Sequence, residues 1–457
     1  MDNFTVSKER NIFSAGNYIP YAAAVQLGGT NYRLTASGRQ LEQDPKNTSQ
    51  QTGSFLSVSS NYAQGVIDPD TGRKQGLGDL AKDLESLLAK AAKENRVIPV
   101  TFNIAGPRLN SEDDAKLVQE KHRELAVQIA KDHPGRFVYA INSKPGSSEN
   151  ILPNEFFDLM NFIDKLAHKE QMQYEFVNDC VCNLRGVAGK YQIQKGSNLV
   201  HLINGTGLNI ALGNDLQAGG KFAEEINTES GHLSPQGLLP DLPFYTNYQE
   251  FLKSKKNSLT LEGFFAGGNL KESPYRGLRG MILYLRSLAP VRDAVKRNGD
   301  VDMRLALDAL NHGYSTDQLI AIEDIQKSPL YELDVENLDN KKIITVANKN
   351  DKLAVRLVEV YSRNLAHALV ATQREALKQA NYFSYSGGWM QTLFDDVSST
   401  KEIFQEEFKK LGVNAQVIDF EAQENMDGLI ELNQNQAKRG YSDFMHDWQS
   451  KFSSFHS

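Results

Sequence analysis

The sequence predicts an α/β protein of two or three domains, in which helices cover β-sheets. The chain has 457 residues, and a domain averages roughly 150 residues. Apolar residues recur at helical spacing from Leu77 to Ala91, and a continuous apolar run at 97–104 follows directly. A second unit of a helix and a strand begins at Asn154 and ends at Val177. Helices that alternate with continuous apolar strands are typical of sheets covered by helices.

Composition narrows the class of protein. Hydrophobic residues make up 40% and charged residues 23% of the chain, the mixture of a soluble globular protein. The formal net charge is −7 and no long basic run is present, so we expect no nucleic-acid partner. No stretch reaches the ~18 apolar residues of a membrane span. The N-terminus lacks the pattern of a secretion signal.

Cys180 and Cys182 are the two cysteines, and one residue separates them. This spacing disfavours a disulfide, and a zinc site needs more ligands than the pair supplies. We therefore expect two packing residues in a reducing compartment, which predicts a cytoplasmic protein. The sequence leaves the oligomeric state undecided, with a homodimer open.

The remaining pattern predicts strands in hairpins and a helical C-terminal half. Strands are predicted at 19–26 and 32–36, a hairpin turn at Ser37-Gly38-Arg39, a polar loop at 43–54 and a turn at 68–72. Short strands are predicted at 199–204 and 209–212, mostly helix at about 270–340, one long helix over 352–377, and a further helix in the last thirty or so residues.

Three glycine turns each follow an apolar strand: Gly28-Gly29-Thr30, Gly205-Thr206-Gly207 and Gly387-Gly388. Glycine lets the backbone adopt positive φ and approach a ligand closely. The exposed N–H groups of such a turn can hold a phosphate. A single turn of this kind is more often a simple hairpin. The dinucleotide and P-loop glycine fingerprints are absent from the sequence.

Asn178 and Asp179 stand at the end of a buried strand, between the first two glycine turns. A carboxylate at the carboxyl end of such a strand faces the edge where α/β sheets bind ligands, and it can accept a proton from a hydroxyl. Taken alone, the pair is more often the cap of the next helix. Farther along, Glu229, His232 and Glu262 offer the acceptors and donor that sugar hydroxyls need, although single residues of these types are usually structural or solvated.

The order of these motifs resembles bacterial glucokinases and their relatives in the repressor–ORF–kinase (ROK) group. The similarity extends over roughly residues 22–412. The segments that carry it are Leu27-Gly28-Gly29-Thr30-Asn31-Tyr32-Arg33, Ala105-Gly106-Pro107, Val177-Asn178-Asp179, Leu202-Ile203-Asn204-Gly205-Thr206-Gly207, Glu229-Ser230-Gly231-His232, Leu261-Glu262-Gly263-Phe264-Phe265-Ala266-Gly267 and Ser386-Gly387-Gly388.

The resemblance implies a two-lobed actin-like ATPase (ribonuclease H-like) fold with a cleft between its lobes. A smaller α/β lobe would cover 18–177. A larger one would cover 178–425, with a helical insertion at about 270–345. A C-terminal helix at 426–457 would pack back on the first lobe. The resemblance also implies an ATP-dependent hexose kinase with ATP and Mg²⁺ as cofactors.

The resemblance assigns a role to each motif residue. Asp179 would be the general base for the sugar 6-hydroxyl. The sugar would be bound by Asn178, Glu229, His232 and Glu262. The nucleotide would be bound by Gly28, Gly29, Thr30, Asn31, Arg33, Gly205, Thr206, Gly207, Gly387 and Gly388. No protein residue is assigned as a metal ligand.

Gln26 departs from the family pattern, which begins the first phosphate motif with Asp. That Asp helps hold the Mg²⁺ on ATP, and a neutral amide is a poorer ligand for a hard cation. Two alternatives to an active kinase therefore stay open. One is a sugar- or nucleotide-binding protein that has lost catalysis, and the other is a different activity on the same fold.

Overall fold

The structure is a computed structural model, and its described residues form two compact units. They are residues 18–27, 31–40, 52–61, 75–104, 124, 127–128, 131, 172–205, 207–217, 220–228, 230–234, 243–267, 275–288 and 300–419. The first unit takes in residues 1–195, 217–222 and 423–457, and the second takes in residues 196–216 and 223–422.

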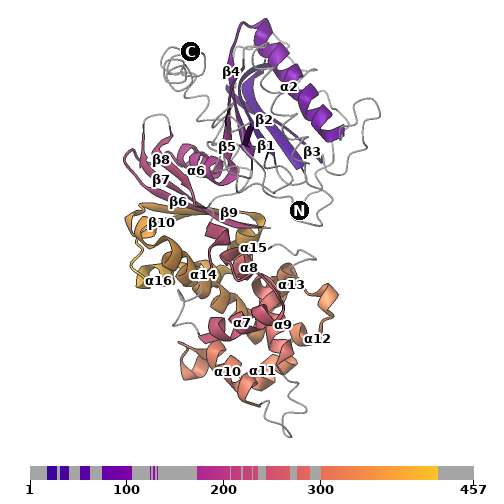
Figure 1. The fold of residues 1–457 in the computed structure, drawn as a ribbon, viewed down its shortest axis with the longest axis vertical. Coiled ribbons are helices and arrows are strands. Elements are labelled where there is room, and N and C mark those ends of the chain that lie inside the picture. The colour runs from indigo at the N-terminus through magenta and orange to yellow at the C-terminus, as the bar shows by residue number, and fades with distance from the viewer. Residues whose placement is uncertain are drawn as a thin grey trace. The chain divides into compact units, whose positions relative to one another are not determined.

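The first unit is built on a five-stranded sheet (Figure 1). Its strands are β1 (Tyr18–Leu27), β2 (Asn31–Gln40), β3 (Thr52–Asn61), β4 (Ile98–Ile104) and β5 (Met172–Asn178), in the order β3-β2-β1-β4-β5. The pairs β1–β2 and β2–β3 are antiparallel, whereas β1–β4 and β4–β5 are parallel. β1, β4 and β5 therefore end at the same edge of the sheet.

Two helices belong to this sheet. α2 (Gln75–Lys93) packs against β1, β2 and β3, and its apolar stripe of Leu80, Leu84, Leu87 and Leu88 is buried as the helical spacing predicts. α6 (Asp179–Lys190) begins at the residue after β5 and packs on β4 and β5. The helix predicted from Leu77 to Ala91 and the strand predicted at 97–104 directly after it are confirmed.

The second unit repeats the same sheet. Its strands are β6 (Leu199–Asn204), β7 (Leu208–Leu216), β8 (Phe222–Asn227), β9 (Tyr382–Ser386) and β10 (Gln416–Asp419), in the order β8-β7-β6-β9-β10. β6–β7 is antiparallel, and β6–β9 and β9–β10 are parallel. Read from its first strand, each sheet has the arrangement 3-2-1-4-5. This duplicated order confirms the α/β prediction and matches the ribonuclease H-like arrangement.

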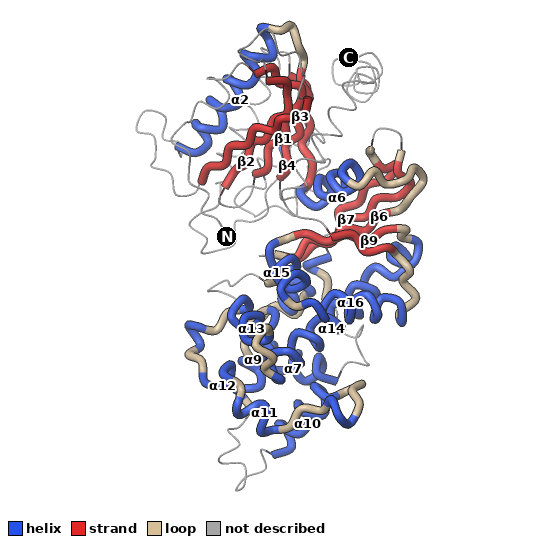
Figure 2. Tube along the Cα trace, turned by 180° about the vertical axis from the view of Figure 1, so that it is seen from behind, coloured by secondary structure: helices blue, strands red, loops and turns tan. Residues whose placement is uncertain are grey.

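Helices make up the rest of the second unit. The long α14 (Lys352–Gln379) packs on α16 (Ser398–Lys410), and with α15 (Gly388–Asp396) they lie next to the sheet (Figures 1 and 2). The other described helices are α7 (Pro243–Ser254), α8 (Leu261–Phe265), α9 (Gly277–Ser287), α10 (Asp300–Asn311), α11 (Ile322–Lys327), α12 (Pro329–Glu332) and α13 (Asn340–Ala347), together with the short 3₁₀ turns η1 (Ser230–His232), η2 (Thr316–Gln318) and η3 (Val335–Asn337). α8 and η1 contact β7, whereas α10, α11 and α12 lie far from the sheet (Figure 2).

Two predictions about the N-terminal region are wrong. Ser37, Gly38 and Arg39 do not form a turn but continue β2, where they pair with β3 across a register shift. The polar loop predicted at 43–54 ends sooner, because β3 begins at Thr52. The turn at 68–72, the predicted helix after Asn154 and the C-terminal helix at 426–457 lie outside the described residues.

The structure also bears on two further expectations, one for the cysteines and one for membrane spans. Cys180 and Cys182 are buried thiols of α6 that form no disulfide, as the packing interpretation requires. Among the described residues, no helix combines the length and the apolar character that crossing a bilayer demands.

Candidate active site

In the first unit, polar side chains gather where the three parallel strands end. Gln26 lies on β1 and pairs with Asn103 on β4. The next β4 residue, Ile104, pairs with Asn178 on β5. Asp179 follows directly as the first residue of α6. The carboxyl edge of parallel strands is where α/β sheets bind ligands, so Gln26 and Asp179 both belong to the candidate edge.

Asn178 caps α6. Its Oδ1 accepts a hydrogen bond from the Cys180 backbone N–H over 2.9 Å, and the side chain is almost fully buried. Asp179 Oδ1 accepts from the same N–H over 2.9 Å. The capping interpretation therefore applies to Asn178, whose acceptor is already in use. The Asp179 carboxylate is only partly buried and has a second oxygen.

In the second unit, two of the three glycine turns meet. β6 and β9 are parallel neighbours, and their last paired residues are Ile203 and Ser386, so both turns lie at one edge. Gly387 has φ +99°, and a Cβ atom there would lie 2.4 Å from the Asn204 carbonyl oxygen. Only glycine fits this position. A Cβ on Gly205 would lie 4.0 Å from the Gly387 Cα.

The turn at Gly387 also starts a helix. Gly387 is the N-cap of α15, and the space around a Cβ on Gly388 is open, with no atom within 4 Å. The first N–H groups of a helix lack intrahelical partners and carry a partial positive charge. An open helix N-terminus beside a glycine turn is a favourable place for a phosphate.

A buried polar network fixes this edge. Asn204 Nδ2 donates to the Phe265 carbonyl over 3.1 Å and to the Tyr361 hydroxyl over 3.2 Å. The Tyr361 hydroxyl donates to the same carbonyl and accepts from Trp389 Nε1 over 2.8 Å. Burial raises the pKa of Tyr361, so the hydroxyl stays a donor. The Gly267 backbone N–H donates to the Gly205 carbonyl over 2.9 Å.

Glu262 brings a carboxylate to the glycine turn. Its Oε1 accepts from Arg276 Nη1 over 3.0 Å, and 12% and 7% of the two side chains are exposed. Its Oε2 would lie 3.5 Å from a Cβ on Gly207. Because Gly207 has no side chain, the Glu262 carboxylate lies next to the backbone of the turn.

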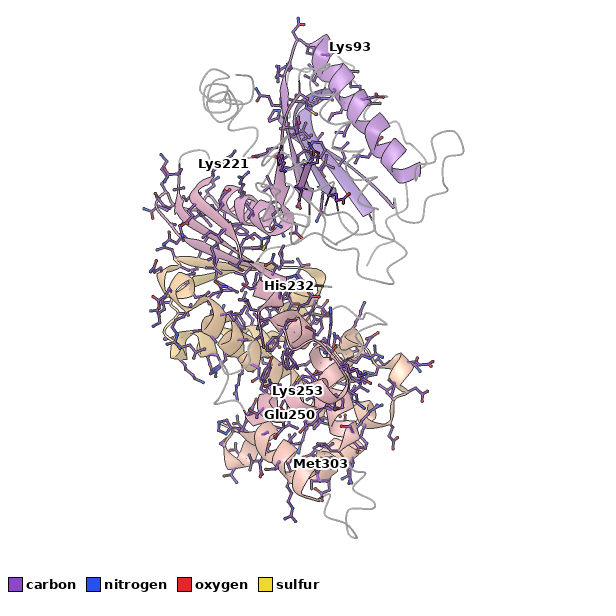
Figure 3. The ribbon with its side chains drawn as sticks, viewed as in Figure 1. Lys93, Lys221, His232, Glu250, Lys253 and Met303 are labelled. Carbon is purple, nitrogen blue, oxygen red and sulfur yellow. The ribbon has the colours of Figure 1, made fainter. Side chains whose placement is uncertain are left out.

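The segment that ends in His232 packs against Glu262. The short helix η1 packs against α8. Figure 3 labels His232, the last residue of η1. A Cβ on Gly231 would lie 1.9 Å from the Leu208 carbonyl oxygen and 3.6 Å from the Glu262 Cβ, so this contact needs glycine. Gln373, at a non-helical position in α14, donates from Nε2 to Ser230 Oγ over 2.7 Å. His232 itself is exposed.

Several predicted site residues lie outside the described residues: Gly28, Gly29, Thr30, Thr206 and Glu229. Asn31 and Arg33 are described only as backbone of β2. Sequence reasoning missed Arg276, Tyr361 and Trp389. Trp389 follows the Gly387-Gly388 turn directly and could have been suspected, whereas nothing near Arg276 signals its pairing with Glu262.

The described residues contain no group of three or more His, Cys, Asp or Glu side chains that could hold a metal ion. The polar side chains at the edge of the first sheet are mainly amides. A metal there would depend on oxygens from a ligand, as Mg²⁺ bound with nucleotide phosphates does.

Comparisons with known proteins return sugar kinases by structure alone. No family model and no curated protein matches the sequence. A glucokinase from an Antarctic psychrotroph is 14% identical and covers 92% of this chain and 99% of its own, with a TM-score of 0.47. A glucokinase from Balamuthia mandrillaris in complex with glucose is 14% identical and covers 93% and 96%, with a TM-score of 0.47. A ROK glucokinase from Streptomyces griseus in complex with glucose and AMPPNP is 16% identical and covers 92% and 99%, with a TM-score of 0.42.

A TM-score below 0.5 does not establish a common fold, so the assignment rests on the sheets of this chain. Each unit has five strands in the order 3-2-1-4-5 with the same parallel and antiparallel pairs wherever the pairing is described. In each, a hairpin joins the first two strands, and the carboxyl edge carries the polar residues. The chain therefore has a duplicated ribonuclease H-like fold.

Proposed function

We propose that the protein is an ATP-dependent kinase that phosphorylates a hexose on its 6-hydroxyl. One observation carries the proposal: two glycine turns, an open helix N-terminus and a buried carboxylate converge at one sheet edge. These residues come from three separate segments of the sequence: the turn with Gly205 and Gly207, the turn with Gly387, and the helix α8 with Glu262. A phosphate-binding turn and a hydroxyl-binding carboxylate side by side are what a sugar kinase requires.

The nucleotide would bind where the glycine turns meet. Gly205 and Gly207 would present backbone N–H groups to the phosphates, and the open space at Gly388 would admit the nucleotide beside the start of α15. Gly28, Gly29, Thr30, Asn31 and Arg33 are proposed for the corresponding turn of the first sheet, and Thr206 for this one. Because Gly387 has no side chain, the turn can form without a clash against the Asn204 carbonyl oxygen. A tight turn without side chains leaves room for the phosphates of ATP.

The sugar would be held by hydrogen bonds to Glu262, His232 and Glu229, and Asn178 is proposed as a further sugar-binding residue. Glu262 suits this role because Arg276 fixes its Oε1 and leaves Oε2 beside Gly207. A carboxylate accepts from two sugar hydroxyls, and an imidazole can donate or accept. Such a set does not distinguish glucose from mannose or N-acetylhexosamines.

Asp179 is proposed as the general base. It would take the proton of the sugar 6-hydroxyl as that oxygen forms its bond to the γ-phosphorus, and the bond from the γ-phosphorus to the β–γ bridging oxygen would break to release ADP. Catalysis of this kind is mainly positioning and charge stabilisation. Mg²⁺ would enter with ATP and neutralise phosphate charge, held chiefly by phosphate oxygens because Gln26 offers only an amide.

A second candidate is a sugar-binding protein without kinase activity. Gln26 favours it, because this neutral residue stands at the end of β1 and pairs with a second amide residue, Asn103. Both candidates use the same sugar contacts. They differ in whether bound sugar is phosphorylated.

ADP release with Mg-ATP across a panel of hexoses and N-acetylhexosamines tests the proposal. Asp179→Asn is the control, since an amide oxygen can still accept from the Cys180 N–H while it no longer takes a proton. Turnover that depends on the sugar and falls about 10³-fold or more in Asp179→Asn supports the kinase. Sugar binding by calorimetry without turnover supports the second candidate, and neither binding nor turnover overturns both.

A further inference from the structure

A cavity of about 290 Å³ lies among the helices of the second unit and shares no lining residue with the glycine turns or Glu262. Its walls come from α7, the end of α10, α14 and α16. We propose that this cavity binds a small metabolite through a phosphate monoester group. The proposal stands on its own residues and does not depend on the kinase activity.

One face of α14 forms the floor of the cavity. Val360, Arg363, Asn364 and His367 all line it, and their spacing of three, four and seven residues places them on one side of the helix. α16 adds Glu407 and Lys410, one turn apart. Polar groups from two helices thus point into one space.

Arg363 is held in place with its donors unused. Its guanidinium carbon lies 4.2 Å from the centre of the Tyr314 ring, which also carries Arg356 at 3.2 Å. Its Nε lies 3.8 Å from Glu407 Oε1, beyond hydrogen-bond distance. Within the described part of the chain, the Arg363 guanidinium donates no hydrogen bond. An ordered guanidinium with free N–H groups is suited to an anion.

Asn364 is the second independent sign of a ligand. Only 5% of this residue is exposed, and it lines the cavity. Its side-chain amide has no hydrogen-bond partner among the described residues. A ligand oxygen at this point would satisfy the amide and Arg363 together.

The donors favour a phosphate monoester over a carboxylate. His367 contacts Glu407 at 3.2 Å and Lys410 contacts it at 2.9 Å. These hydrogen bonds, first from His367 and then from Lys410, lower the pKa of Glu407 to about 2 against the effect of burial. Ionised Glu407 repels any anionic ligand, so affinity must come from hydrogen-bond donors. Arg363, Asn364 and Lys410 supply donors from three side chains, which match the three acceptor oxygens of a phosphate monoester better than the two of a carboxylate.

The rest of the cavity suits a small carbon skeleton. Phe244, Ala309 and Val360 give it an apolar side. Its volume corresponds to roughly ten water molecules at liquid density, more than a phosphate group needs by itself. A phosphate on a short polyol or similar metabolite would fill both parts.

Calorimetric titration of the full chain with glycerol 3-phosphate tests the proposal, with glycerate at equal ionic strength as the carboxylate comparison. We expect glycerol 3-phosphate to bind and glycerate to bind about tenfold more weakly or not at all. Lys410→Gln should weaken glycerol 3-phosphate binding about tenfold or more, because one charge-assisted hydrogen bond is lost. Lys409→Gln is the matched control, since Lys409 is the exposed neighbour on α16 that does not line the cavity.

Arg363→Gln is the second variant, and we expect it to abolish the binding of glycerol 3-phosphate. Thermal melting verifies that each variant is folded. Because phosphates could also bind at the glycine turns, the difference between Lys410→Gln and Lys409→Gln assigns the site. Absence of binding to the wild type overturns the proposal. So does wild-type affinity in folded Lys410→Gln and Arg363→Gln. Glycerate that binds as tightly as glycerol 3-phosphate overturns the phosphate assignment.

Discussion

Arg276 donates from Nη1 to Oε1 of Glu262 over 3.0 Å, and both side chains are almost entirely buried. The arginine is the N-cap residue of α9 and lies outside every motif that the sequence singled out. It fixes the carboxylate proposed to bind the sugar and keeps its other oxygen next to Gly207. The residue that precedes α9 thus completes the candidate site.

Replacing Arg276 by Gln should lower the free energy of unfolding by about 3 kcal/mol, because it leaves the buried Glu262 charge without its partner. It should also raise the KM for the sugar more than it lowers kcat, since the carboxylate loses its fixed orientation. Denaturant unfolding and initial rates measure the two effects.

Lys253→Gln is the control for an exposed ion pair. Lys253 Nζ lies 2.6 Å from Glu250 Oε1 on the surface of α7, and both residues are labelled in Figure 3. Exposed ion pairs of this kind contribute about 0.5 kcal/mol or less to the free energy of unfolding. Equal stability losses in Lys253→Gln and Arg276→Gln would contradict the special role of the buried pair.

Gly387 and Gly388 should respond differently to the same substitution. Gly387→Ala should destabilise the protein by more than about 2 kcal/mol, because an alanine is strained at φ +99° and its Cβ would clash with the Asn204 carbonyl. Gly388→Ala should change stability by less than about 1 kcal/mol, since the space around it is open and alanine is compatible with a helix.

Thermal melting and titration with an ATP analogue measure both variants. We expect Gly387→Ala to lose nucleotide binding and Gly388→Ala to fold normally, with any loss of binding due to the methyl group alone. Normal folding and binding in Gly387→Ala would show that the turn does not have to be this tight.

The sequence could predict the parts of the fold that repeat an apolar period. β1, β4, β6 and α14 were predicted because each buries a continuous run or a helical stripe. β8 and β10 were missed because they are the two edge strands of their sheet. Edge strands are short and polar: β10 has four residues, and most of β8 is not buried. In the first sheet, β3 was also missed, and its sequence is rich in Ser.

The candidate site divides in the same way. Glycine turns and the Asn178-Asp179 pair have local signals, so their segments could be identified in order. The groups that hold the site together have none. Tyr361 reaches Asn204 across 157 residues of sequence, and Gln373 reaches Ser230 across 143. Such contacts follow from tertiary packing, which no single window of the sequence contains.

His201 should make the stability depend on pH. It is fully buried on β6, and its ring nitrogens contact Ser384 Oγ at 2.8 Å and Ser386 Oγ at 2.9 Å. Burial lowers the pKa of His201 to about 3 from an ordinary value of 6.5. Below pH 6.5 the unfolded chain therefore binds a proton that the native state does not, so stability falls from pH 6.5 down to about pH 3.

His201→Gln should remove this dependence. Between pH 7.5 and pH 4.5, the wild type should lose about 3 kcal/mol more than the variant. Glu407→Gln should keep the wild-type slope, because the lowered pKa of Glu407 contributes stability that is lost only as pH falls from 4.5 toward about 2. Denaturant unfolding at several pH values measures all three proteins. Parallel curves for the wild type and His201→Gln would contradict the burial argument.

Gln26→Asp should raise the rate of the proposed kinase. Gln26 is the next-to-last residue of β1, at the same sheet edge as Asp179, and a carboxylate there binds Mg²⁺ better than an amide does. We expect kcat to rise by about tenfold or more, which corresponds to about 1.4 kcal/mol of transition-state stabilisation. The Mg²⁺ concentration needed for half-maximal rate should fall in the same variant.

Gln26→Glu is the matched control, because it adds the same charge on a side chain that is longer by one methylene. A gain in Gln26→Asp alone would show that the position of the carboxylate matters, while equal gains would indicate a general effect of charge. If neither variant gains activity while sugar still binds, Gln26 is not what limits the rate, and loss of catalysis in this chain would need a different cause.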